Sequence, residues 1–224
     1  MAFEMIPDRP GREIMFEPLL DSLLEVFSPA WVLPEQMVNH HPHHRCEVKR
    51  WEVGRAAEED PDLTRRHADR LIDAAMHDQC RSGINQLVRP LVKSLGHRWT
   101  QKQIIKYLRS GTNAQKVGAT MAWYFSRPGL TYASREDLAN RTPTPESKAA
   151  LDALGDLRAD YRDAVLAAFL GSEDLETRQD LSLWISLETS AYPDTLQSDH
   201  QRAKEIILAN PDGYRLILQR CRQS

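Results

Sequence analysis

The spacing of apolar residues is the feature that most constrains the fold of this chain. Large apolar side chains recur every three or four residues, a pattern that places them along one side of an α-helix. Three such stripes are formed by Phe16, Leu19, Leu20, Leu23, Leu24 and Phe27, by Ile84, Leu87, Val88, Leu91, Val92 and Leu95, and by Leu154, Leu157, Tyr161, Val165 and Ala168. No segment alternates apolar and polar residues as a half-buried strand does. We therefore predict an all-α protein of eight or nine helices.

Cap and turn residues mark where some of these helices begin or bend. Asn210 followed by Pro211 predicts the start of the last helix, and Ser134 and the Pro193-Asp194 step predict two further starts. Pro90 lies inside the second apolar stripe. Because proline lacks the amide hydrogen that a helix interior uses, we expect a kink at this residue.

One helix-turn-helix pattern occurs twice, at residues 107–123 and 169–184. In both copies an apolar helix ends at a short polar turn, Asn113 or Asp174 is available as an N-cap, and a tryptophan follows ten residues later. A single helix pair cannot bury both of its faces. Such units therefore stack on their neighbours.

The turn residues of this unit resemble those of the HEAT-repeat family, in which an aspartate at the turn is followed shortly by a basic residue. Here the pairs are Asp174 with Arg178 and Asn113 with Lys116, and the resemblance covers residues 83–224. It implies antiparallel helix pairs stacked as a short HEAT-like solenoid. Proteins of this family are usually binding scaffolds, and the fold alone does not specify a ligand.

The N-terminal part of the chain fits this pattern least. Between residues 28 and 60 lie three prolines, a histidine cluster and an acidic run, which predict a long loop. We expect residues 1–62 to form an N-terminal helix with a loop-rich cap, and residues 63–224 to form the HEAT-like helical domain. Because no apolar run is long enough for a membrane helix and no signal pattern begins the sequence, we expect a cytoplasmic protein without membrane contact.

The distribution of charge is uneven along the sequence. Residues 79–135 contain no acidic residue, although the chain has 32, and they contain ten of its 29 basic residues. Several of the basic residues share one side of a predicted helix at spacings of three and four. We predict that this side, with two tryptophans, contacts a partner through Arg89, Lys93, Arg98, Lys102, Lys106, Arg109, Lys116, Trp99 and Trp123.

Three interpretations of this basic side remain open at the level of sequence. It faces acids of the protein itself, among them Asp156, Asp160, Asp163 and Asp180, or only water; it binds an acidic protein; or it binds the phosphates of a nucleic acid. Our leading hypothesis is a non-enzymatic adaptor or immunity-type inhibitor. It binds an acidic macromolecule, with a protein as the favoured partner, and it needs no cofactor. The HEAT resemblance also gives an alternative, a nucleic-acid-binding protein similar to the HEAT-like alkylpurine DNA glycosylases. Residues 79–135 lack the carboxylate that those enzymes use.

Histidines and carboxylates offer two weaker metal hypotheses. Four histidines and a cysteine lie between His40 and Cys46, and imidazole and thiolate groups are good ligands for zinc, copper or nickel. Pro42 interrupts this cluster and argues for a solvated loop.

The second metal hypothesis concerns Asp69, Asp73 and His77, which are spaced at i, i+4 and i+8 on one predicted helix and are followed directly by Asp78. The His77-Asp78 step resembles the central motif of the HD-type phosphohydrolases, which are metal-dependent and all-α. That resemblance implies that His40, His43 or His44 supplies an earlier histidine of the site and Asp137 its later aspartate. The usual glycine after the motif is replaced by Gln79-Cys80.

Overall fold

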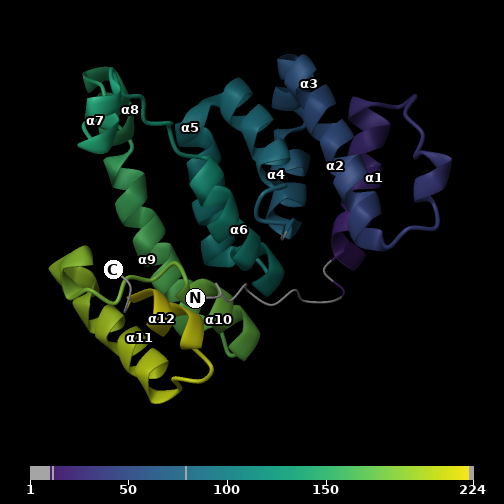
Figure 1. The fold of residues 1–224 in the computed structure, drawn as a ribbon. Coiled ribbons are helices and arrows are strands. Elements are labelled where there is room, and N and C mark those ends of the chain that lie inside the picture. The colour runs from purple at the N-terminus through teal and green to yellow at the C-terminus, as the bar shows by residue number, and fades with distance from the viewer. Residues whose placement is uncertain (1–10, 12, 79, 222–224) are drawn as a thin grey trace.

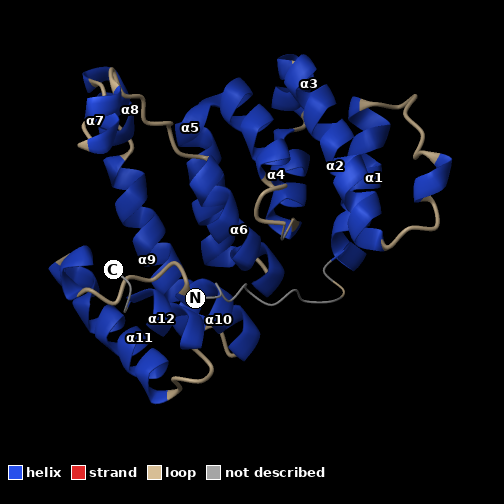
Figure 2. Ribbon diagram, viewed as in Figure 1, coloured by secondary structure: helices blue, strands red, loops and turns tan. Residues whose placement is uncertain are grey.

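In the computed structural model, residue 11, residues 13–78 and residues 80–221 are described. Their regular structure is entirely helical, as Figures 1 and 2 show, and the predicted all-α fold class is confirmed. The α-helices are α1 (Glu13–Phe27), α2 (Pro42–Glu59), α3 (Pro61–Arg66), α4 (Ala68–His77), α5 (Asn85–Ser110), α6 (Asn113–Phe125), α7 (Arg135–Ala139), α8 (Pro145–Asp152), α9 (Gly155–Gly171), α10 (Leu175–Ser182), α11 (Gln197–Ala209) and α12 (Arg215–Cys221). The described part has twelve α-helices against the eight or nine predicted, because helices such as α3 and α8 are too short to carry an apolar stripe.

The helices stack as successive pairs. Helices α5 and α6 form one pair and α9 and α10 the next; α5 packs on α9, and α6 packs on α10. On the other side, α2 packs on α5 and α4 packs on α6. Helix α1 lies against α2 and α11 against α9, so they lie toward opposite ends of the stack (Figure 1). This stacking of antiparallel pairs is the solenoid-like arrangement that the repeated turn predicted.

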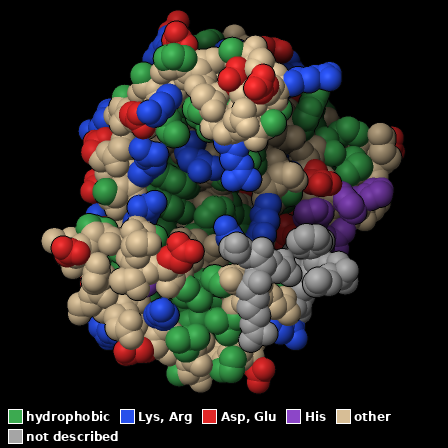
Figure 3. All heavy atoms as spheres, turned by 60° about the vertical axis from the view of Figure 1, so that its left-hand side comes forward, with side chains coloured by type: hydrophobic (Ala, Val, Ile, Leu, Met, Phe, Trp, Pro, Cys, Tyr) green, Lys and Arg blue, Asp and Glu red, His purple; other side chains and the backbone are tan. Residues whose placement is uncertain are grey.

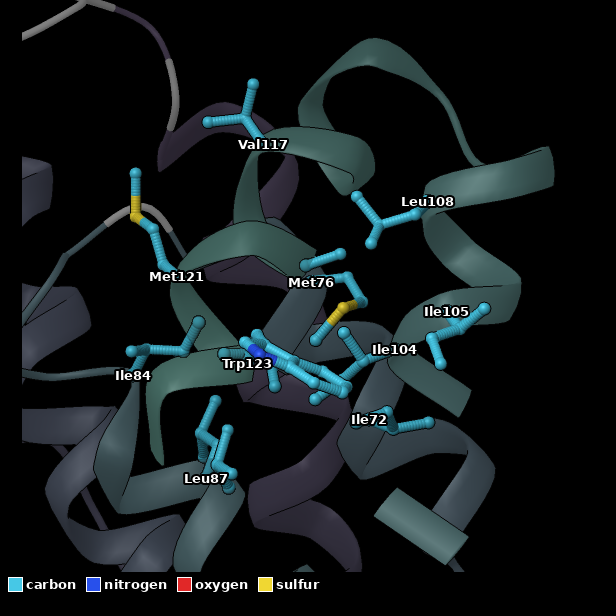
Figure 4. Packing of buried hydrophobic residues seen from close by; sticks show 14 of the residues in the cluster. Ile72, Met76, Ile84, Leu87, Ile104, Ile105, Leu108, Val117, Met121 and Trp123 are labelled. Carbon is cyan, nitrogen blue, oxygen red and sulfur yellow. The ribbon is translucent and has the colours of Figure 1, made fainter. Parts of the chain in front are cut away.

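A continuous apolar core runs through the stack. Its buried members extend from Phe16 in α1 to Ile217 in α12. Figure 4 shows Trp123 between Met76 and Ile104, so side chains from α4, α5 and α6 meet there. Trp123 also stacks on Tyr161 of α9, with ring centroids 4.1 Å apart and planes 8° from parallel. The predicted apolar stripes supply much of this core.

The predicted loop between residues 28 and 60 is wrong in its second half. Residues 42–59 form α2, which packs on both α1 and α5. Pro42 does not prevent this helix because it is its first residue, where the missing amide hydrogen has no intrahelical partner to lose. The predicted boundary after residue 62 falls within α3.

The bend in α5 lies at Gly96 and not at Pro90. Gly96 has φ +83° and ψ 162°, whereas Pro90 is buried within the helix. Glycine adopts a positive φ without the steric cost that a Cβ atom brings. The apolar stripe of α5 therefore ends where the backbone changes direction.

The predicted caps are partly correct. Asp174 and Ser134 each accept a backbone hydrogen bond at the start of α10 and α7. At the first copy of the repeated turn the cap is Thr112 and not Asn113, because Thr112 and Gln115 bond reciprocally. Asn210 closes α11 and accepts a hydrogen bond from the Gly213 amide, so α12 begins later than predicted.

Two glycines let neighbouring helices approach at backbone distance. A Cβ atom on Gly118 of α6 would lie 2.0 Å from the carbonyl oxygen of Met76, and one on Gly54 of α2 would lie 2.5 Å from that of Gln86. Both distances are shorter than real Cβ contacts. These positions fix how closely α6 meets α4 and α2 meets α5.

We expect Gly118→Ala to lower the free energy of unfolding by about 1–3 kcal/mol, because α4 and α6 must separate to admit the new methyl group. Alanine favours a free helix by about 1 kcal/mol over glycine, so a loss of stability would oppose intrinsic propensity. Urea denaturation measures the change. Gly171→Ala is the matched control, since a Cβ there meets nothing within 4 Å. Equal stability of both variants would contradict the close approach.

Candidate functional site

An open groove lies between α2 and the first half of α5. It encloses about 590 Å3 and is lined by Trp51, Gly54, Arg55, Glu58, Glu59, Ser82, Asn85, Gln86, Arg89 and Lys93. Its base is the contact between Gly54 and Gln86, where no side chain separates the two helices. The lining residues of α2 and those of α5 form its two walls. Arg89 and Lys93, two of the predicted contact residues, belong to the α5 wall.

The walls of the groove combine an exposed aromatic ring with several charges. Trp51 is 56% exposed although it is large and apolar. Arg55 bonds Glu52 and Glu59 on its own helix, and Arg89 pairs with Glu58 across the groove. Lys93 is exposed and has no acidic partner among the described residues. The groove is therefore lined by one cation without an acidic partner in the described chain and by one exposed aromatic side chain.

A buried ion pair lies under this groove. Arg50 of α2 and Asp78 at the end of α4 are 3% and 1% exposed. The Arg50 Nη1 atom donates to both carboxylate oxygens, at 3.1 and 3.2 Å, and its Nε atom donates to Gln86 Oε1 at 3.2 Å. Burial raises the pKa of Asp78 to about 6, and the attraction of Arg50 offsets only part of that increase.

The basic row on the second half of α5 meets acids of α9 at two points. Arg98 donates two hydrogen bonds to Asp156, at 2.7 and 2.9 Å, and Arg109 donates one to Asp163 at 2.7 Å. The bonds from Arg98 lower the pKa of Asp156. The interpretation that this side faces the protein's own acids therefore holds for these two arginines.

The lysines of the same row differ from the arginines. Lys102 and Lys106 are exposed, and neither has an acidic partner in the part of the chain that the structure describes. Lys116, in the first turn of α6, is half-buried. The predicted basic residues are thus divided between internal pairs and uncommitted lysines.

The two predicted tryptophans are not exposed contact residues. Trp123 is 5% exposed and belongs to the core, and Trp99 is half-buried and packs against that core. Trp123 is not available for stacking on a ligand at this surface. Among the described tryptophans, Trp51 is the exposed one, and it lines a groove with basic residues. Apolar spacing did not indicate it because residues 28–60 were predicted as loop.

The residues of the HD-type hypothesis have other partners. Asp73 accepts hydrogen bonds from Gln115 Nε2 at 2.8 Å and from the Tyr107 hydroxyl at 3.2 Å, and Asp78 is paired with Arg50. His77 ends α4 and is half-buried. Across residues 13–78 and 80–221, no three His, Cys, Asp or Glu side chains are arranged to hold a metal ion. The HD-type site stays a prediction without geometric support.

The histidine cluster lies at the start of α2 and not in a loop alone. His43 and His44 are in the first turn, with ring centroids 5.6 Å apart, and the rings of His40 and His44 are 6.0 Å apart. The nearby carboxylates are Glu13 of α1 and Glu47, at nitrogen to oxygen distances of 3.4–3.7 Å. His43 and His44 are thus exposed or partly exposed side chains whose rings lie next to carboxylates.

The buried pair predicts a large effect of removing one partner. Asp78→Ala leaves Arg50 charged and buried, so we expect a loss of about 3–5 kcal/mol in the free energy of unfolding. Chemical denaturation at pH 7 measures it. Asp62→Ala, which removes the partner of exposed Arg65, is the control and should change stability by less than about 1 kcal/mol. If the double variant Arg50→Leu/Asp78→Leu is no more stable than Asp78→Ala, the unpaired charge is not the cause.

The raised pKa of Asp78 also predicts a pH dependence. Its pKa is about 6 in the folded protein against 3.8 ordinarily, so the folded state binds this proton more tightly. The contribution of Asp78 to stability is therefore fully present below pH 3.8 and is lost as the pH rises through 6, by about 3 kcal/mol at most. The difference in unfolding free energy, wild type minus Asp78→Asn, should fall between pH 4 and 7. A difference that rises with pH would show that Arg50 outweighs burial.

Two further findings bear on what the chain is. No helix in the described part is both long enough and apolar enough to span a lipid bilayer. Comparison of the chain with protein-family models, with curated proteins and with solved structures found no match. The likeness to HEAT repeats therefore stays a prediction.

Proposed function

We propose that this protein is a non-catalytic α-helical binding protein that holds an acidic segment of a partner protein along the basic side of α5. The observation that carries the proposal is that Lys93, Lys102 and Lys106 are exposed on one helix without acidic partners among the described residues. Uncommitted cations on a helical surface attract anionic segments and orient them; Lys102 and Lys106 follow the bend at Gly96, and Lys93 precedes it. An adaptor and an inhibitor would use the same surface.

The mixture of positive and negative side chains on the surface supports a protein partner. Figure 3 displays several Lys and Arg side chains around a hollow on one face, with Asp and Glu side chains nearby. The α2–α5 groove likewise contains Glu58 and Glu59 beside its cations. A polyphosphate backbone would be repelled by such carboxylates, whereas a protein segment of mixed charge can match both signs.

Charge reversal tests this proposal. A fluorescein-labelled oligoglutamate peptide should bind the wild-type chain with an affinity that decreases with salt, measured by fluorescence anisotropy. Lys102→Glu/Lys106→Glu should weaken binding by about tenfold or more. The control Lys148→Glu/Arg202→Glu makes the same change in net charge at exposed residues of α8 and α11 and should bind nearly as wild type.

Two results would contradict the proposal. Equal weakening in both double variants would mean that only net charge matters. Tighter binding of single-stranded DNA than of the peptide, with a linear decrease of log affinity against log salt, would assign the basic side to nucleic acid instead.

A further inference from the structure

The α2–α5 groove has the dimensions of a binding site for a short helix. Its α2 wall runs from Trp51 to Glu59 and its α5 wall from Asn85 to Lys93, so each wall covers about two helical turns or 12 Å. At the base the two helices meet closely, since a Cβ on Gly54 would lie 2.5 Å from the Gln86 carbonyl oxygen. A volume of about 590 Å3 lies within the range of ordinary ligand clefts.

The side chains of the two walls determine which kind of helix this groove can bind. Single exposed apolar residues are common on protein surfaces and need no function. Trp51 differs because it lies in the same groove as Lys93, a cation without an acidic partner in the described chain. Tryptophan is the residue most enriched at the energetic centres of protein interfaces, where it fills apolar pockets of the partner.

We infer that the groove binds an amphipathic acidic helix of the partner protein, with Trp51 packing on its apolar face and Lys93 pairing with one of its carboxylates. An amphipathic helix laid in a groove presents residues at i, i+3, i+4 and i+7 on one side, which matches two turns of wall. Arg89 also lines the groove and its side chain is 65% exposed, but it is already paired with Glu58. This inference rests on the proposed function and specifies its recognition site.

The experiment uses a fluorescein-labelled amphipathic peptide with leucines on one helical face and glutamates on the other, and a scrambled peptide of the same composition. We expect the first peptide to bind the full chain and the scrambled one to bind at least tenfold more weakly. Trp51→Ala and Lys93→Glu should each weaken binding of the amphipathic peptide by about tenfold. Tyr124→Ala, at a 57% exposed ring of α6 outside the groove, is the control and should bind as wild type.

Other outcomes overturn the inference. It fails if neither peptide binds, if both bind equally, or if Trp51→Ala behaves as Tyr124→Ala does. It also fails if oligothymidylate binds with the Trp51 dependence expected of the peptide, because the occupant is then a single-stranded nucleic acid. Because Trp51 and Lys93 are exposed, circular dichroism and thermal unfolding of their variants should match wild type.

The proposed function and the groove can fail separately. If Trp51→Ala has no effect while Lys102→Glu/Lys106→Glu abolishes binding of oligoglutamate, the basic side of α5 binds its partner elsewhere and only the groove inference is lost. If none of these variants changes binding of either peptide, both proposals are wrong.

Discussion

The pair formed by Arg50 and Asp78 fixes the place where three helices meet. Arg50 projects from α2, Asp78 ends α4, and Gln86 of α5 accepts the remaining Arg50 hydrogen bond. Since neither charge reaches solvent, α2 cannot move away without leaving a charge unpaired in the interior. Gly83 is part of the same constraint: a Cβ there would lie 2.1 Å from the guanidinium carbon of Arg50. The relative position of α2 and α5, and with it the groove, depends on this contact.

Apolar periodicity was enough to find α1, α5 and α9, because each buries one whole side of a helix. It failed for α2 for a physical reason. The buried residues of α2 include Lys49, Arg50 and Glu52, whose charges are satisfied by partners on other segments or other turns. Burial of charge leaves no apolar stripe in the sequence. The helix that carries Trp51 was therefore predicted as loop.

The candidate site was predictable in charge but not in geometry. The run without acids in residues 79–135 correctly indicated many basic side chains, and their spacing placed Arg98, Lys102, Lys106 and Arg109 along one side of α5. Spacing within one helix cannot tell which of them meet an acid from a neighbouring helix. That depends on how α5 packs on α9, which brings Asp156 and Asp163 to the arginines and leaves the lysines exposed.

Helix α5 makes two junctions in the stack, and they differ in a way that bears on function. Between α5 and α9, the contacts advance along both helices from Arg98–Asp156 to Arg109–Asp163. Between α2 and α5, they advance from Gly54–Gln86 to Glu58–Arg89. Helices α2, α5 and α9 therefore run in the same direction. Acids of α9 bridge the first junction. At the second, a glycine lets the two backbones approach closely, and Trp51 and Lys93 are exposed residues of the groove beside this contact. The α2–α5 junction thus combines a glycine contact with the Arg89–Glu58 ion pair, whereas two ion pairs bridge the α5–α9 junction, and the helices pack at both while the groove stays open.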